Sequence, residues 1–269
     1  MEALKKFRLI DDAFFSAVFD DNAKDVEYIL RIILEKDDLK VLKVQTQKSV
    51  ENIYGRSVRF DVFATDTQGK LYNIEVQRAE VGAIPARARY NSVMLDYHEL
   101  KKQEEFKELP TSFVIFITEN DVIGDDEKIY HIDRIVRETG KEFGDDTHII
   151  YVNGSFKGEE GKPLDDLIHD FFCENPKDMR HKQLADRVKF LKENKGGMNR
   201  MNNIIAEIFK DEIAEATKET AEKTAEETKK NTLVESIHNL METMNLSSDA
   251  VMKAMKIPPE VQNQLRPLI

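Results

Sequence analysis

Three residues whose types suit metal chemistry, Asp61, Glu75 and Gln77, lie in two alternating segments, SVRFDVFAT (57–65) and KLYNIEVQR (70–78). Alternation of apolar and other residues is typical of β-strands, in which successive side chains point to opposite faces. In the second strand, Glu75 and Gln77 share one face and lie about 6–7 Å apart along the strand. In the first strand, Asp61 is expected on the face opposite to the apolar residues Val58, Phe60, Val62 and Ala64.

The linker between these strands, DTQGK (66–70), decides whether the two carboxylates meet. It contains a glycine and has the length of a hairpin loop. If all five residues form the loop, Asp61 lies directly opposite Glu75. A four-residue loop would place Asp61 opposite Ile74 and on the other face, so the prediction depends on the register.

Two carboxylates on neighbouring strands are the ligands that a hard cation requires. Mg²⁺ prefers oxygen ligands at about 2.1 Å and keeps several waters, which leaves positions for a phosphate oxygen and an attacking water. Gln77 can orient either group by hydrogen bonding, but an amide cannot act as a base or a cation. The alternative is that Asp61 and Glu75 are surface residues on the solvated side of a hairpin.

The segments around the hairpin predict an α/β domain over residues 1–195. Residues 12–34 show a helical apolar period that Asn22 interrupts, and Pro85 begins a helical pattern that reaches about residue 106. The apolar residues of that second helix are Tyr90, Val93, Met94, Tyr97 and Leu100, and both tyrosines are expected in the core rather than against nucleic-acid bases. The other predicted elements are strands at 40–48, 57–65, 71–78, 111–118 and 148–152, and helices at 126–138, 164–173 and 177–194.

Strand signals end after residue 195. Residues 196–231 include a tract rich in Ala, Thr, Glu and Lys, which predicts a charged helical linker or a weak coiled coil. Residues 232–269 predict a small helical segment in which Ser247-Ser248-Asp249 is placed to cap a helix. A homodimer formed through these C-terminal helices is one hypothesis for the role of the tail.

Composition narrows the classes of function. The formal net charge of −11 argues against a broadly DNA-binding surface, because Lys and Arg supply most non-specific affinity for DNA. No segment has the ~18 consecutive apolar residues of a membrane span, and no apolar signal segment follows the N-terminus, so a cytoplasmic protein is expected. The single cysteine, Cys173, is expected to be a small buried side chain. The histidines have no zinc-site spacing, and no glycine motif for a nucleotide cofactor is present.

The hairpin RFDVFATDTQGKLYNIEVQ (59–77), in which Asp61 is followed after thirteen residues by Glu75-Val76-Gln77, resembles the PD-(D/E)XK nuclease family transposases, also described as Rpn-type recombination-promoting nucleases. The resemblance extends to Asp12, Phe15, Val18 and Phe19, to RARY (87–90) and to the apolar strand 113–117. It implies a restriction-endonuclease-like fold, a mixed sheet flanked by helices with an αβββαβ core, followed here by an all-helical C-terminal tail.

The resemblance also implies roles for the residues of the hairpin. Asp61 and Glu75 correspond to metal ligands, and the main-chain carbonyl of Val76 completes the set. Gln77 stands where many relatives have lysine, and Phe60 stands where the motif has proline. The change from lysine to glutamine removes a positive charge that a nearby arginine would have to supply.

The candidates for that charge lie at the start of the next helix. Arg87 is the first choice and Arg89 the second, with Tyr90 beside them, whereas Arg78 is expected to project from the opposite face. Asp12 either adds a carboxylate through a metal-bound water or caps its own helix.

Taken together, residues and resemblance predict a Mg²⁺-dependent DNA endonuclease that hydrolyses phosphodiester bonds, with Mn²⁺ as a substitute cation. The family resemblance implies a link to DNA recombination or transposition. The alternative is a catalytically weak nuclease-fold protein that binds or regulates partners through its helical tail, which the net charge of −11 favours.

Overall fold

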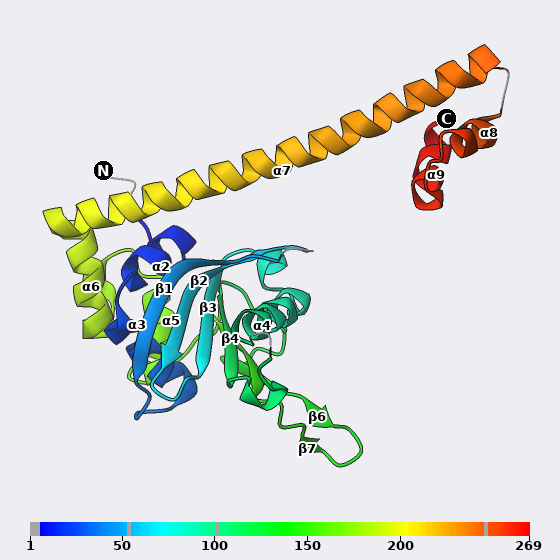
Figure 1. Ribbon diagram of the computed structural model, residues 1–269. Coiled ribbons are helices and arrows are strands. Elements are labelled where there is room, and N and C mark those ends of the chain that lie inside the picture. Colours follow the sequence, from blue (N-terminus) through cyan, green and yellow to red (C-terminus); the bar gives the residue numbers. More distant parts are fainter. Residues whose placement is uncertain (1–5, 53–54, 101–102, 245–246) are drawn as a thin grey trace. The chain divides into compact units, whose positions relative to one another are not determined.

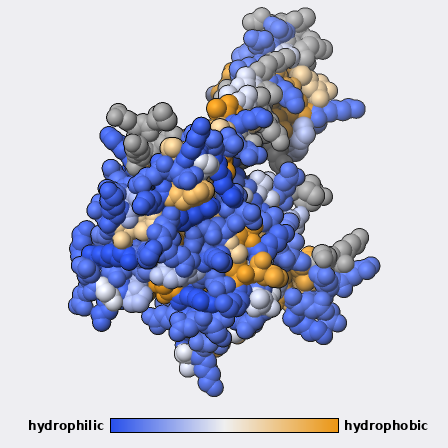
Figure 2. All heavy atoms as spheres, turned by 90° about the vertical axis from the view of Figure 1, so that its left-hand side faces the viewer, coloured by the Kyte–Doolittle hydropathy of each residue, from blue (hydrophilic) through white to orange (hydrophobic). Residues whose placement is uncertain are grey.

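The fold is described by a computed structural model that covers residues 6–52, 55–100, 103–244 and 247–269. The chain divides into two compact units, Met1–Ile208 and Phe209–Ile269. Among the helices of these described ranges, none has both the length and the apolar character needed to cross a membrane. On the face drawn in Figure 2, hydrophilic residues predominate and apolar residues gather in small patches.

The first unit is built on a six-stranded mixed sheet with the order β1-β2-β3-β4-β8-β5 (Figure 1). An antiparallel meander, β1 (Val41–Val50), β2 (Val58–Asp66) and β3 (Leu71–Gln77), forms one side of it. Strands β4 (Ser112–Thr118) and β8 (Thr147–Asn153) continue it in parallel with β3, and β5 (Ile129–Ile132) closes the edge antiparallel to β8. Strand β4 is buried throughout, as its unbroken apolar run predicts.

Helices cover both faces of this sheet (Figure 1). The larger core lies under α2 (Asp12–Phe19), α3 (Ala23–Leu34), α5 (Pro163–Phe171), α6 (Lys182–Glu193) and the beginning of α7 (Lys195–Met244). The predicted break between α2 and α3 is confirmed, because the Asn22 side chain accepts a hydrogen bond from the Asp25 N–H at 3.4 Å and caps α3.

Helix α4 (Pro85–Glu99) covers the other face and follows a short 3₁₀ turn, η1 (Glu80–Ala83). Pro85 begins the helix as predicted, but the predicted end near residue 106 is wrong. Leu100 already has extended backbone angles, and residues Phe106–Glu108 form a separate 3₁₀ turn, η2. The predicted core positions Val93 and Tyr97 are 54% and 52% exposed. The predicted core position Met94 is confirmed at 1% exposure, and the other buried residues of α4 are Ala88, Asn91, Ser92 and Leu95.

The helix predicted at 126–138 is also wrong. This segment forms β5 and then β6 (Ile135–Val136), which pairs with β7 (Lys141–Glu142) in a two-stranded hairpin. Tertiary pairing decided the outcome, because the open edge of β8 offers backbone partners to residues 129–132. The predicted helix at 177–194 begins later, at Lys182, after the 3₁₀ turn η3 (Pro176–Asp178).

The second unit is entirely helical, as the tail was predicted to be. It comprises the later part of α7 with α8 (Ser248–Ala254), α9 (Pro259–Leu265) and the 3₁₀ turn η4 (Arg266–Leu268). The Ser247 hydroxyl accepts a hydrogen bond from the Ala250 N–H at 3.4 Å and caps α8. The small core of this unit consists of Ile237, Val251, Met252, Ile257 and Leu265.

Candidate active site

The register of the β2–β3 hairpin brings the two candidate carboxylates together. Thr65 pairs with Leu71 and Val62 pairs with Ile74, so residues 66–70 form the five-residue loop and the next step of the register places Asp61 opposite Glu75. Asp66 stabilises this loop, since its Oδ1 accepts hydrogen bonds from the main-chain N–H groups of Gln68 and Lys70 at 2.8 and 2.9 Å. Gly69 has a φ of 81°, a conformation that glycine adopts without strain.

Asp61 is directly tied to β3. The Val76 N–H donates a hydrogen bond to Asp61 Oδ2 at 3.0 Å, just beyond the last pair of the β2–β3 ladder. Residues of a strand direct their N–H and C=O groups alternately to the two sides. The carbonyl of Gln77 accepts from the Glu119 N–H, on the β4 side, so the carbonyl of Val76 turns towards Asp61.

The regular alternation of β2 fails at its beginning, where Val58 and Phe60 pack in the core opposite to that of Val62. Phe60 was expected on the face of Val62, but it packs in the other core with Phe63, at a distance of 6.4 Å between ring centroids. Gln47 of β1 lies opposite Asp61, because its neighbours Thr46 and Lys48 pair with Val62 and Phe60. Gln47 has a φ of 51°. A positive φ is uncommon in a residue other than glycine, so Gln47 marks a local irregularity of β1 opposite this point of β2.

Glu75 is completely buried and its two oxygens have different surroundings. Oε2 accepts a hydrogen bond from Arg87 Nη2 at 2.9 Å, whereas Oε1 has no partner among the described residues. Burial raises the pKa of Glu75, and the positive charge of Arg87 acts in the opposite direction. The pKa of Asp61 is also raised, by burial, by Glu75 and by Asp12 in that order. Burial therefore disfavours the charged form of both carboxyls, and neighbouring carboxylates add to this effect.

Arg87 reaches this site from the first turn of α4. Besides its bond to Glu75, its Nη1 donates to the Gly82 carbonyl at 2.9 Å, and its guanidinium carbon lies 5.9 Å from the centre of the Phe116 ring. Arg89 is exposed on the same helix. Tyr90 is half-buried, donates to the carbonyl of Arg56 and accepts from Asn52 Nδ2, so its hydroxyl fastens the β1–β2 connection.

Asp12 lies near the carboxylates, and the interpretation of Asp12 as a helix cap is wrong. The N-cap of α2 is Asp11, and Asp12 is the first residue of the helix. Its Oδ1 accepts a hydrogen bond from Gln47 Nε2 at 3.2 Å, and its charge raises the pKa of both Asp61 and Glu75. Arg78 is exposed and forms ion pairs with Asp11 and Glu119 instead.

Gln77 is half-buried at the end of β3 and packs against Gly82. A Cβ atom built on Gly82 would lie 1.8 Å from Gln77 Oε1, so any side chain there would displace the amide. Sequence reasoning missed Gly82, because nothing in its local pattern marks the contact. It also missed the buried Asn73, which shares the face of Glu75 within the same motif.

A second cluster of potential ligands occurs in the described part of the chain, where atoms of His169, Asp170 and Cys173 lie within 4.8 Å of one another. Asp170 is already saturated: its oxygens accept from the main-chain N–H groups of Arg180 and His181 at 2.7 and 2.8 Å. Cys173 is half-buried, and burial raises the pKa of its thiol to about 11. The hydrogen bonds of Asp170 fasten the connection between α5 and α6.

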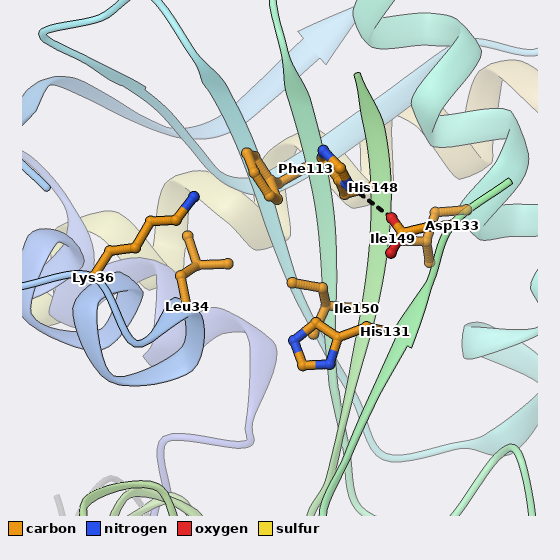
Figure 3. A pocket seen from close by; sticks show the side chains of 8 residues that line it. All are labelled: Leu34, Lys36, Phe113, His131, Asp133, His148, Ile149 and Ile150. Carbon is orange, nitrogen blue, oxygen red and sulfur yellow. Dashed lines mark hydrogen bonds and ion pairs between the residues drawn. The ribbon is translucent and has the colours of Figure 1, made fainter. Parts of the chain in front are cut away.

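A cavity of about 170 Å³ lies near the beginning of β4 and β8, and its wall includes Phe113 from the larger core, on the face of the sheet away from α4 (Figure 3). Asp133 and His148, joined at 2.6 Å, stand on one side of it and Lys36 on the other. Phe113 in its wall pairs with Tyr72, whereas Glu75 pairs with Phe116 three residues further along. The cavity is therefore separate from the carboxylate site.

The mixed sheet flanked by helices, with two carboxylates meeting on a β-hairpin beside an arginine, defines a restriction-endonuclease-like nuclease fold. The chain belongs to the PD-(D/E)XK nuclease family transposases, whose family profile matches residues 15–240. Membership implies a nuclease-type hydrolase with DNA as its substrate class. Comparisons with curated proteins and with solved structures found no match.

Proposed function

We propose that this protein is a Mg²⁺-dependent DNA endonuclease whose active centre consists of Asp61, Glu75 and Gln77. The observation that carries the proposal is the meeting of two buried carboxylates, Asp61 at 6% and Glu75 at 0% exposure, across the β2–β3 hairpin. Two buried like charges destabilise a fold unless an opposite charge offsets them. Arg87 neutralises at most one of them, which leaves the site suited to a divalent cation.

The donor set fits Mg²⁺, with Mn²⁺ as its substitute. Asp61, Glu75 and the main-chain carbonyl of Val76 offer hard oxygen atoms, and Asp12, whose charge acts on both carboxyls, would add a carboxylate through a water. When bound, the cation would supply a Lewis acid that acidifies water and neutralises charge on a phosphodiester.

The neighbouring side chains would position the substrate. Gln77 would orient the attacking water or a non-bridging phosphate oxygen through its amide. Arg87 carries the positive charge that the lysine-to-glutamine change removes, and its planar guanidinium suits a phosphate. Arg89, exposed on the same helix, is a candidate for contact with the DNA backbone. Because the net charge is −11, DNA contact would be local to this end of the molecule.

The biological setting that the family suggests is DNA recombination or transposition. The helical second unit supports a further proposal, a homodimer formed through the C-terminal helices, because α7 exposes Phe209 at 49% and Ile213 at 67%. Light scattering on the full chain and on a chain ending at residue 208 tests this, and equal monomer masses would reject the dimer. The alternative of a catalytically weak interaction protein predicts that metal-dependent cleavage is weak or absent.

Cleavage of supercoiled plasmid in Mg²⁺ and in Mn²⁺ tests the enzymatic proposal. Asp61→Asn and Glu75→Gln keep the shape of each side chain and remove its charge, so both should abolish cleavage, while Gln77→Ala should reduce it. Arg78→Gln, outside the candidate site, serves as the matched control and should cleave like the wild type. If all variants and the wild type behave alike, the proposed function is wrong.

A further inference from the structure

Buried polar atoms without partners are concentrated beside Glu75. Among the described residues, both amide atoms of Asn73, Oε1 of Glu75 and Oγ of Ser112 are buried with no hydrogen-bond partner, as is Oε1 of Gln47 on β1. Asn73 and Glu75 are two residues apart on β3 and therefore face the same side of the sheet, under α4. Ser112 pairs with Leu71, which lies two residues before Asn73 on β3 and so points to the same face.

The neighbours of Asn73 on the two adjacent strands give no structural reason for an amide. Phe63 lies opposite it on β2 and Val114 lies beside it on β4, and both side chains are buried and apolar. An apolar residue of similar size would fill this position without the cost of desolvating an unpaired amide. Within the same face, the polar group closest along the strand is the carboxylate of Glu75, at the ordinary strand spacing of about 6–7 Å.

Glu75 has a matching requirement. Arg87 occupies Oε2, and Oε1 lacks a donor. Asn73 and Glu75 lie two residues apart on the same face of β3, so the Asn73 amide is a close side-chain donor along the strand for this oxygen. A carboxylate that holds a metal generally needs a second donor that fixes its orientation.

We propose that Asn73 is a positioning residue of the metal site, whose Nδ2 group donates to Glu75 Oε1 and fixes this carboxylate for a divalent cation. The inference rests on the proposed function and adds a residue to it. In the metal-free protein the amide and the carboxylate oxygen remain unpaired at the cost of stability. In the metal-bound protein a small side-chain adjustment pairs them.

This proposal predicts that metal affinity and metal-free stability respond differently to one substitution. In Asn73→Leu the unpaired amide is removed, so thermal stability without metal should equal or exceed that of the wild type. Loss of the orienting donor should weaken Mn²⁺ and Mg²⁺ binding about tenfold or more. Ser112→Ala, which removes another unpaired buried group on the same face, is the matched control and should leave metal affinity unchanged.

The experiment is calorimetric titration of the full chain with Mn²⁺ and with Mg²⁺, together with thermal unfolding in chelator, for wild type, Asn73→Leu, Ser112→Ala and Glu75→Gln. If leucine prevents folding, Asn73→Ala removes the same donor without added bulk. Weaker binding in the Asn73 variant with undiminished metal-free stability supports the proposal. Unchanged affinity, or an equal loss in Ser112→Ala, overturns it.

The two proposals fail in distinguishable ways. If Glu75→Gln abolishes metal binding and the Asn73 variant does not weaken it, Asn73 has no positioning role and the metal site stands. If the wild type binds neither cation, both the site and the role of Asn73 are rejected.

Discussion

Replacing Arg87 with glutamine tests whether this arginine neutralises Glu75 in the metal-free protein. Removing one partner of a buried ion pair typically costs about 3–5 kcal/mol. The Arg87 side chain is 37% exposed, so solvent screens part of the interaction. Glu75 can also take up a proton, because burial raises its pKa. The expected loss of stability is therefore about 1–2 kcal/mol, a decrease of about 2–8 °C in Tm for a unit of this size.

The response to metal should run in the opposite direction. Arg87 and a cation compete for the same carboxylate, so Mg²⁺ should raise the Tm of Arg87→Gln more than it raises that of the wild type. Cleavage should nevertheless fall, because the charge that would face the phosphate is lost. Circular dichroism melting in chelator and in Mg²⁺ measures the two changes in Tm, with Arg89→Gln as the matched control for melting, and the plasmid assay measures cleavage. A smaller Mg²⁺ shift in Arg87→Gln than in the wild type would refute the reasoning.

Three further outcomes are expected. Gly82→Ala should reduce plasmid cleavage about as much as Gln77→Ala, because the new Cβ atom would lie 1.8 Å from the flexible end of the Gln77 side chain. The loss of stability should be no more than about 1 kcal/mol. Cleavage at the wild-type rate would contradict this contact. Burial alone would raise the pKa of Asp170, but its hydrogen bonds with His181 and Arg180 lower this pKa below the ordinary value. The ionised carboxylate therefore stabilises the fold above its unfolded pKa of about 3.9, and this stabilisation is lost as the pH falls through the lower pKa of the folded state. In urea unfolding, Asp170→Asn should therefore cost about 1.5–3 kcal/mol at neutral pH and clearly less in acid, and an equal cost at both would argue against it. Ile115→Ala, at a fully buried position of β4, should cost about 2–5 kcal/mol by the same method, and a negligible cost would show that β4 is not central to the core.

Much of the fold was predictable from local pattern. The alternation of β3, the unbroken apolar run of β4 and the cap at Asn22 each depend on residues close in sequence, and each is found as predicted. Predictions failed where a distant element decided the outcome. Residues 129–132 became a strand because β8 offered an open edge, and Val93 and Tyr97 are exposed because α4 turns a different side, which includes Met94 and Leu95, towards the core.

The sequence alone determined the chemical types of the candidate site, which are two carboxylates and an amide in one hairpin. It also showed that the position of Asp61 depends on whether the loop has five residues or four. Tertiary structure decided that Asp61 meets Val76 and Glu75, that Arg87 crosses from α4 to Glu75 Oε2, and that Asn73 is buried without a partner. The reason is physical: side-chain spacing within a strand follows from covalent geometry, whereas contact between a helix and a sheet depends on how both cores pack.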